Sequence, residues 1–311
     1  MILDVIDYLY ALSLDKDIRK PNRLKFIPRN IIKVLVNVFV PVYYSITGHF
    51  YRIIPKDVPY LIVSLTSFPA RIKTLHIVIE SLMRQSVKPD RLMLWLSKEQ
   101  FPDEKKSLPK NLLDMERRGL EICFVEDDLR PHKKYFYAMQ QYPDADVITV
   151  DDDIFYPQNL LKYLVDANKK YPTCVCCNRA IRFTLDNGKL KSYIDWNPID
   201  LKKDSQPNYR ILPTGVGGIL YPHGSLKRDM LFDKQIIKSS CINADDLWLN
   251  LMARFNNTRT VHSGRRVGLI PLLSTKSSAL SNNNIFNGND LQIQKLKDYF
   301  GENGFMYNLK N

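Results

Sequence analysis

Asp146-Val-Ile-Thr-Val-Asp-Asp-Asp-Ile154 decides the fold prediction for this chain, because an apolar run ends directly in three consecutive acids. A short apolar run of this kind is typical of a strand buried on both faces. Three adjacent carboxylates repel one another unless a cation lies among them, and Mg²⁺ and Mn²⁺ prefer carboxylate oxygens. Side chains alternate along an extended chain, so Asp151 and Asp153 can share a face while Asp152 turns aside. We interpret the run as a divalent-cation site rather than a solvated loop.

Three earlier apolar runs alternate with helical patterns in the same way. Strands are expected at residues 60–66, 91–96, 120–125 and 146–150, each followed by a helix, the last of them running from about 157 to 170. Four strand–helix alternations predict an α/β fold, a mainly parallel sheet flanked by helices. Ligands bind beyond the carboxyl ends of such strands. That rule brings the strand ends together around one crevice at Thr66-Ser67, Ser97, residues 126–128 and residues 151–153.

After Cys177 the alternation stops. Asn187-Gly188 predicts a hairpin turn, because both residues readily adopt positive φ angles. A strand is expected at 211–221, interrupted by glycines at 215, 217 and 218, and helices at 244–255 and 289–300. No proline- or glycine-rich linker divides this part of the chain, so one continuous domain is predicted.

Residues 1–57 form a predicted helical extension. Residues 31–46 are its most apolar part, but Lys33, Asn37 and Pro41 interrupt them, and they fall short of the roughly 20 residues that a spanning helix needs. The basic residues before them are Arg19, Lys20, Arg23, Lys25 and Arg29. Such a segment can lie on an anionic membrane surface. Packing of the apolar side on the chain's own domain is the main alternative, and crossing a membrane is the least favoured.

The composition of the 311 residues, 45% hydrophobic and 25% charged, is that of a globular protein. The net charge of +12 suits anionic partners. Nucleic acid is disfavoured, because the chain lacks the usual binding motifs and its strand-end acids would repel phosphate. The five cysteines, which include Cys174-Val-Cys-Cys177, show no disulfide spacing. They indicate buried thiols in a reducing compartment, and the expected location is the cytoplasm, with peripheral attachment to the inner face of its membrane.

Three segments, taken in order, resemble bacterial polysaccharide-type glycosyltransferases of the GT-A fold. They are Thr66-Ser-Phe-Pro-Ala-Arg-Ile72, Asp128-Leu-Arg-Pro-His-Lys-Lys-Tyr-Phe-Tyr-Ala-Met139 and the acid run, which looks like the DxD region of that family. The resemblance covers roughly residues 60–300. It implies a GT-A-like (Rossmann-like) domain over 58–311, with a nucleotide-sugar-binding half at 58–155 and an acceptor-binding half at 156–311.

The resemblance implies a metal-dependent transfer of a sugar from a nucleotide-diphosphate donor, with a UDP-sugar favoured. The acceptor would be a hydroxyl of a saccharide or lipid-linked saccharide, in the synthesis of bacterial capsule, O-antigen or lipopolysaccharide. Asp151 and Asp153 would hold the ribose and the diphosphate-bound metal, Mn²⁺ or Mg²⁺. The other residues implied in the donor site are Thr66, Ser67, Arg71, Asp127, Asp128, Lys133, Lys134, Asp152, Gly217 and Gly218.

Asn243-Ala-Asp-Asp-Leu-Trp-Leu249 opens the helix expected at 244–255. The resemblance implies that Asp246 takes the proton from the acceptor hydroxyl, with Asp245 as the alternative base. The ordinary explanation of such an acid pair is helix capping. A late histidine completes the metal site in many members of the family; His262 is the candidate here, followed by His223, and neither lies in a distinctive motif. A nucleotidyl- or phosphoryltransferase with the same acidic metal site is the alternative function.

Overall fold

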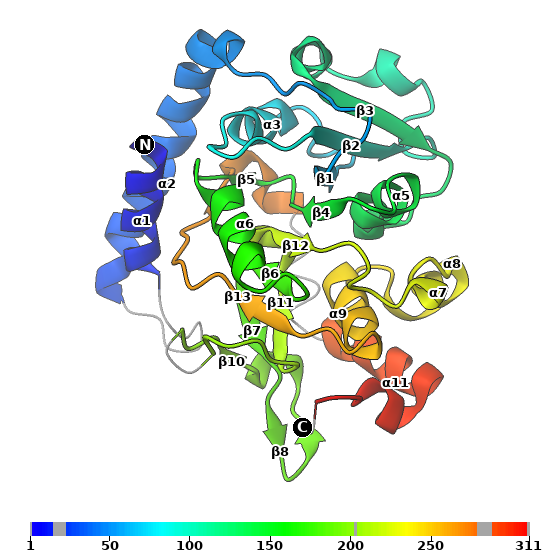
Figure 1. The fold of residues 1–311 in the computed structure, drawn as a ribbon. Coiled ribbons are helices and arrows are strands. Elements are labelled where there is room, and N and C mark those ends of the chain that lie inside the picture. The colour runs from blue at the N-terminus through cyan, green and yellow to red at the C-terminus, as the bar shows by residue number, and fades with distance from the viewer. Residues whose placement is uncertain (1, 15–22, 202–203, 279–287, 310–311) are drawn as a thin grey trace.

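The computed structural model describes residues 2–14, 23–201, 204–278 and 288–309. A seven-stranded sheet lies at its centre (Figure 1). In sheet order its strands are β13 (Thr260–His262), β6 (Val175–Cys177), β12 (Ile219–Tyr221), β4 (Asp146–Thr149), β1 (Leu61–Thr66), β2 (Arg91–Ser97) and β3 (Leu120–Val125). The four strands expected in the first half of the chain are therefore present, and β4, β1, β2 and β3 are neighbours.

The pairings in this sheet are parallel except those of β12, which is antiparallel to both β4 and β6. The predicted mainly parallel α/β sheet is confirmed. The strand expected at 211–221 is interrupted at its glycines, as predicted, but the turn at Gly215–Gly217 divides it into two separate strands. Its first part, β11 (Ile211–Pro213), pairs with β7 (Ala180–Arg182) in a separate sheet that β10 (Asn197–Pro198) completes.

Helices cover both faces of the central sheet, because its strands are apolar on both sides. On β1, Val63 and Leu65 face the core beneath α3, while Ile62 faces the core beneath α5 and α9. The longer helices are α1 (Ile2–Ser13), α2 (Arg23–Thr47), α3 (Leu75–Met83), α5 (Lys133–Gln141), α6 (Leu160–Lys170), α9 (Asp245–Phe255) and α11 (Asn289–Phe305). Short helices are α4 (Lys110–Leu113), α7 (Arg228–Leu231) and α8 (Lys234–Ile236).

Several helix boundaries differ from those expected. The helix expected between the strands at 91–96 and 120–125 is only α4 followed by a 3-10 turn, and α6 begins at Leu160, three residues after Pro157. The hairpin is present between β8 (Leu185–Asp186) and β9 (Lys189–Leu190), with φ angles of 48° at Asn187 and 77° at Gly188. The five cysteines form no disulfide, and those of β6 are buried.

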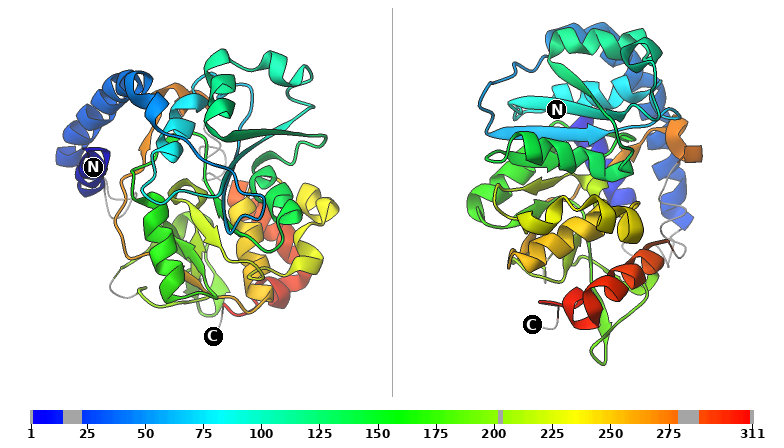
Figure 2. Two further views of the ribbon diagram at one scale, coloured as in Figure 1. Left: turned by 45° about the horizontal axis from the view of Figure 1, so that its top comes forward. Right: turned by 90° about the vertical axis from the view of Figure 1, so that its right-hand side faces the viewer.

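The N-terminal helices α1 and α2 lie together along one flank of the molecule (Figures 1 and 2). Val36, Val40 and Tyr44, at helical spacing on α2, are buried in the same core as α3 and β1. Removing residues 1–57 would therefore uncover part of that core. Arg19 and Lys20 of the predicted basic cluster lie outside the described residues.

A short two-stranded sheet joins this flank to the acid run. It pairs β14 (Ile270–Pro271) with β5 (Ile154–Phe155), which directly follows Asp153. The backbone N–H of Leu272 donates to the carbonyl of Asp153 at 2.8 Å. We call residues 267–273 the strap, because they connect the N-terminal helices to the loop that carries the acids.

Candidate active site

The acid run lies beyond the carboxyl end of β4, in the centre of the sheet. Its middle member, Asp152, turns inward as side-chain alternation predicts. It accepts a hydrogen bond from Ser67 Oγ at 2.5 Å and is ion-paired with the buried guanidinium of Arg71. Arg71 also approaches Asp153 at 3.1 Å. The turn after β1 thus fixes the loop that presents Asp151 and Asp153.

Lys134 joins this loop to the start of α9. Its Nζ lies 2.8 Å from Asp151 Oδ1 and 2.9 Å from Asp245 Oδ2, and its side chain is almost fully buried. Burial alone would lower its pKa, but Asp151, Asp245 and Asp246 raise the pKa of Lys134 well above its usual value. Lys134 is therefore a permanent cation. The capping role considered for Asp245 is wrong, since α9 follows Ala244 with no side-chain cap hydrogen bond and the Asp245 carboxylate faces Lys134.

Asp246 lies beside Lys134 with one oxygen engaged and the other without a partner. Its Oδ2 accepts a hydrogen bond from the backbone N–H of Gly215 at 2.9 Å. Its Oδ1 is buried and has no hydrogen-bond partner among the described residues. An unsatisfied buried carboxylate oxygen is costly, so it marks a place where a donor group is missing. A substrate hydroxyl is a group of the required kind.

The cluster as a whole contains more acids than bases. Its members are Asp151, Asp152, Asp153, Asp245 and Asp246 with Lys134 and Arg71. Burial and the neighbouring Asp151 raise the pKa of Asp153 to about 7, although Arg71 opposes the shift. Burial and Asp245 likewise raise the pKa of Asp246 to about 8, against the lowering effect of Lys134. Both shifts show that the cluster favours additional positive charge.

Asp151 and Asp153 fit a divalent cation of the Mg²⁺ or Mn²⁺ type. Within the described part of the chain, no three His, Cys, Asp or Glu residues are grouped to form a complete metal shell. Mg²⁺ sites in enzymes commonly use one or two carboxylates, with water and substrate phosphates supplying the other ligands. Two nearby carboxylates in a cluster short of positive charge match that donor set.

A second group predicted for the donor site forms its own network beyond β3. Lys133 is buried and ion-paired with Asp128, which also accepts a hydrogen bond from Gln100 Nε2 at 2.8 Å. Asp127 is ion-paired with Lys234 on α8. Burial lowers the pKa of Lys133, with Asp128 opposing the shift. The two adjacent lysines of α5 thus serve different carboxylates, and only Lys134 belongs to the acid cluster.

Thr66, Gly217 and Gly218, the remaining residues predicted in the donor site, have roles in the backbone structure. Thr66 Oγ1 donates to the carbonyl of Trp95 at 2.7 Å. A side chain at Gly217 would meet Arg179 Cβ at 2.6 Å, and Gly218 has a φ of 75°. These two glycines therefore shape the turn into β12.

The structure does not bring either candidate histidine to the acids. His262 ends β13, three strand spacings from β4 and so about 14 Å away along the sheet. Its Nδ1 accepts the backbone N–H of Gly264, and burial lowers its pKa to about 4. His223 follows β12, and its backbone N–H donates to Asp146, the first residue of β4, at 2.9 Å. His223 therefore lies at the start of β4, whereas the acids follow the end of that strand.

Three further residues shape the site: Tyr156 and Tyr193, which were not predicted in it, and Gly215, which belongs to the glycine-interrupted stretch expected at 211–221. Tyr156 Oη accepts the backbone N–H of Asp151 at 2.8 Å, which orients the acid run. Tyr193 lies near Asp246, and burial together with this carboxylate raises its pKa to about 12. A side chain at Gly215 would come within 2.9 Å of Lys134 Nζ and 3.0 Å of Asp151 Oδ1. The glycine cluster at 215–218 was a usable signal, but the sequence did not show which glycine faces the site.

Replacing Gly215 with alanine is expected to weaken donor binding at least about tenfold, because the new methyl group must displace Lys134 or Asp151. The backbone at this position has no positive φ, so the free energy of unfolding should change by only about 1 kcal/mol or less. Calorimetry of donor binding and thermal unfolding measure the two effects. Gly304→Ala on α11, where the methyl group meets only Phe300, is the control. Equal donor affinity in both variants would show that Gly215 does not border the donor.

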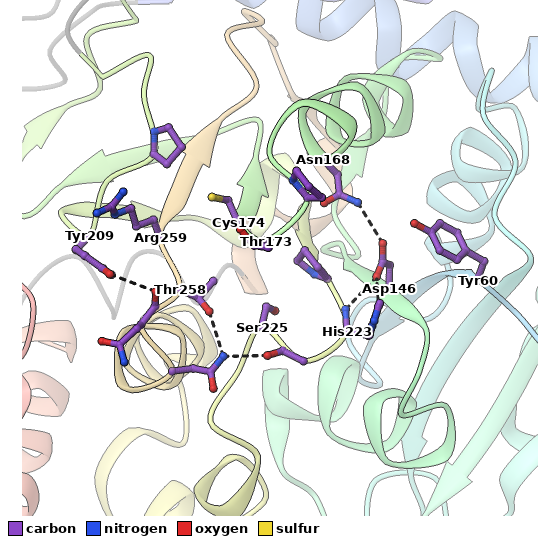
Figure 3. Close-up of a pocket in the computed structure, with 16 residues that line it drawn as sticks. Tyr60, Asp146, Asn168, Thr173, Cys174, Tyr209, His223, Ser225, Thr258 and Arg259 are labelled. Carbon is purple, nitrogen blue, oxygen red and sulfur yellow. Dashed lines mark hydrogen bonds and ion pairs between the residues drawn. The ribbon is translucent and has the colours of Figure 1, made fainter.

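A hollow of about 690 Å³ lies at the end of the sheet where β4 begins, away from the acid cluster (Figure 3). Asp146, Asn168 and His223 converge there, with Asn168 Nδ2 donating to Asp146 Oδ2 at 3.2 Å. Asp146 begins β4, and Asp151 follows its other end about 16 Å away. The hollow is thus separate from the acid cluster. The acid cluster lies beyond the carboxyl ends of the strands, where ligands of parallel sheets bind.

No protein-family model and no curated protein sequence matches this chain. Among solved structures, it is similar to the mannosyltransferase PcManGT from Pyrobaculum calidifontis in complex with GDP-Man and Mn²⁺. The TM-score is 0.40 and the sequence identity is 12%. The match covers 75% of this chain and 64% of that chain, which is less than two thirds of the mannosyltransferase.

Proposed function

We propose that this protein is a metal-dependent glycosyltransferase that moves a sugar from a nucleoside-diphosphate donor to a hydroxyl group of an acceptor. The observation that carries the proposal is the acid cluster itself. It combines two carboxylates suited to a divalent cation, a buried permanent cation at Lys134, and a carboxylate, Asp246, whose Oδ1 has no partner among the described residues. The first two features match one requirement of the reaction, and the third matches another.

The first requirement is stabilisation of the departing diphosphate. Asp151 and Asp153 would hold Mn²⁺ or Mg²⁺, and the chemistry supplied by that ion is neutralisation of the diphosphate charge. Lys134, fixed between Asp151 and Asp245, keeps a positive charge beside the same place. A fixed charge aimed at developing negative charge needs no reorganisation during the reaction.

The second requirement is removal of the acceptor proton. Asp246 Oδ1 accepts the proton of the hydroxyl while the hydroxyl oxygen attacks the anomeric carbon and the bond to the diphosphate breaks. The backbone N–H of Gly215 holds the other carboxylate oxygen in place. The pKa of Asp246, about 8, lies close to neutral pH. A general base works best when its pKa is near the pH at which the enzyme operates. A base on the acceptor side favours inversion at the anomeric carbon.

The finer assignment rests on the three segments that resemble GT-A glycosyltransferases. On that basis we assign the domain to the GT-A type, favour a UDP-sugar as donor, and favour a saccharide or lipid-linked saccharide as acceptor. The same resemblance supports a role in bacterial surface-polysaccharide synthesis.

A donor screen tests the proposal directly. The full chain is incubated with UDP-, GDP-, TDP- and CMP-sugars, with Mn²⁺ or with EDTA, and binding and slow hydrolysis are followed. We expect one donor to bind in a Mn²⁺-dependent manner and to release a nucleoside diphosphate. Release of a sugar 1-phosphate from the same donor would instead identify transfer of the nucleotidyl group. Equal donor affinity in Mn²⁺ and EDTA would contradict the assigned metal site.

A further inference from the structure

The outer side of α2 carries a row of exposed apolar residues. Its members recur at intervals of three and four residues and are 49–65% exposed: Ile31, Leu35, Val38, Val42 and Ile46. The opposite side of the helix is buried at Val36, Val40 and Tyr44. Exposed apolar residues lie also on α1, which packs against α2: Val5, Tyr8, Leu9 and Leu12. We call these nine residues the outer face. Apolar patches of this kind on a protein surface mark contacts with a partner or a membrane.

The charge of this segment identifies the kind of partner. Residues 18–56 contain eight lysine and arginine residues and no aspartate or glutamate. Residues 1–17 add one lysine and four aspartates, so residues 1–56 carry a net charge of +5. A basic segment with an apolar face is the composition of helices that lie in the interface of a membrane with anionic lipids.

The N-terminal helices are fixed to the domain by polar contacts, which are buried at Asp7 and partly exposed at Asn37. Asp7 on α1 accepts the backbone N–H groups of Gly268 and Leu269 at 2.7 and 2.8 Å. Asn37 on α2 accepts the N–H of Leu273 at 2.8 Å and donates to the carbonyl of Pro271 at 3.0 Å. Both helices are thus bonded to the strap. Their orientation relative to the sheet is set by these bonds and by the buried side of α2.

This attachment decides between crossing a membrane and lying on it. The helical stretch Leu24–Phe50 is long and apolar enough to cross a bilayer by length and composition. To cross, however, α2 would have to leave the core and expose Asn37 to lipid. Asn37 would then lose its bonds with Pro271 and Leu273 and keep only the one that its Nδ2 donates to the carbonyl of Lys33. Lying flat requires neither change.

A second copy of the chain is a poorer occupant than a membrane. In a two-fold symmetric pair the same surface meets itself. Residues 18–56 carry no acid, and Asp4 and Asp7 of α1 are bonded to backbone N–H groups of the domain. The basic residues of one copy would therefore find little opposite charge on the same surface of the other. Anionic headgroups supply that charge.

We propose that α1 and α2 form a monotopic membrane anchor, which lies in the plane of an anionic leaflet such as the inner face of the cytoplasmic membrane. The outer face enters the headgroup region, and the basic residues pair with lipid phosphates. This inference does not depend on sugar transfer, because the anchor and the acid cluster are separate groups of residues.

Co-sedimentation of the full chain with vesicles tests the anchor. We expect binding to phosphatidylcholine vesicles that contain phosphatidylglycerol, and binding at least about tenfold weaker to phosphatidylcholine alone, since basic residues near an anionic surface add to affinity. The double substitution Val38→Gln with Val42→Gln should weaken binding to the anionic vesicles at least about tenfold, because two exposed apolar side chains no longer enter the lipid. The control, Leu291→Gln with Tyr299→Gln, removes equally exposed apolar residues from α11 and should bind as the unaltered chain does.

Three results would overturn the proposal. The first is failure of the unaltered chain to bind anionic vesicles. The second is protection of an N-terminal tag from protease added outside the vesicles, which would show that α2 crosses the bilayer. The third is a dimer in solution that the Val38/Val42 variant makes monomeric while vesicle binding is unchanged, which would assign the outer face to a second copy. Thermal unfolding of each variant verifies that the fold is retained.

Discussion

Asp151→Asn and Asp153→Asn should each abolish Mn²⁺-dependent donor binding and lower kcat by about 10²–10³-fold, the range for loss of a group that stabilises developing charge. Neither change should lower thermal stability much. Lys134 keeps Asp245 as a partner when Asp151 is neutral. Removing the charge of Asp153, whose pKa burial and Asp151 raise to about 7, relieves repulsion. Calorimetry with donor in Mn²⁺ and in EDTA, combined with thermal unfolding, measures both effects.

Asp152, which lies between these two residues, provides the control substitution. Asp152→Asn weakens the buried contacts with Arg71 and Ser67, so it should cost roughly 3 kcal/mol in the free energy of unfolding, as for other broken buried pairs. Substitution of Asp151 or Asp153 is thus expected to affect donor binding, whereas substitution of Asp152 is expected to affect stability. If Asp152→Asn removed metal dependence while the other two variants kept it, the assignment of the metal ligands would be wrong.

Asp246→Asn should lower kcat by about 10²–10⁴-fold with donor affinity preserved, which is the usual effect of losing a general base. In the unaltered enzyme kcat/KM should rise with pH as Asp246 loses its proton, and this rise should be absent from the variant. The measurement is turnover with a true acceptor across a pH series, with donor affinity determined in parallel.

Asp245→Asn is the matched comparison, because the two acids are adjacent on α9. Asp245 is the more buried of the two partners of Lys134, so its loss should mainly reduce stability, but by only about 1 kcal/mol, because Lys134 keeps Asp151 as a partner. The reverse pattern, in which Asp245→Asn slows turnover and Asp246→Asn does not, would make Asp245 the base. If neither change slowed turnover, the inverting mechanism would lose its support.

The sheet was predictable from the sequence because its strands are short apolar runs that end in polar residues. Leu120–Val125 and Asp146–Thr149 fall where the runs predict them. The fate of residues 211–221 was not predictable. Ile211–Pro213 and Ile219–Tyr221 are similarly apolar, and only pairing with distant strands assigns them to different sheets.

The sequence predicted which residues form the site better than it predicted which of them contact one another. Asp151, Asp153, Lys134 and Asp246 are brought together, but the contact of Lys134 with Asp245 spans more than a hundred residues and has no local signal. Lys133 and Lys134 look alike in sequence, yet the turn of α5 directs them to different carboxylates. Tertiary packing also decides that His262 and His223 lie away from the acids.

The antiparallel position of β12 has a consequence for synthesis of the chain. Strands β1 to β4 are contiguous in the sequence and can pair as soon as they are made, but the free edge of β4 is covered only by Ile219–Tyr221. That segment is made about seventy residues later, which at ribosomal rates corresponds to roughly 4–14 s. During that interval an apolar strand edge remains open to aggregation. Nascent chains halted between β4 and β12 should therefore require chaperone protection, and those extended beyond Tyr221 should require less.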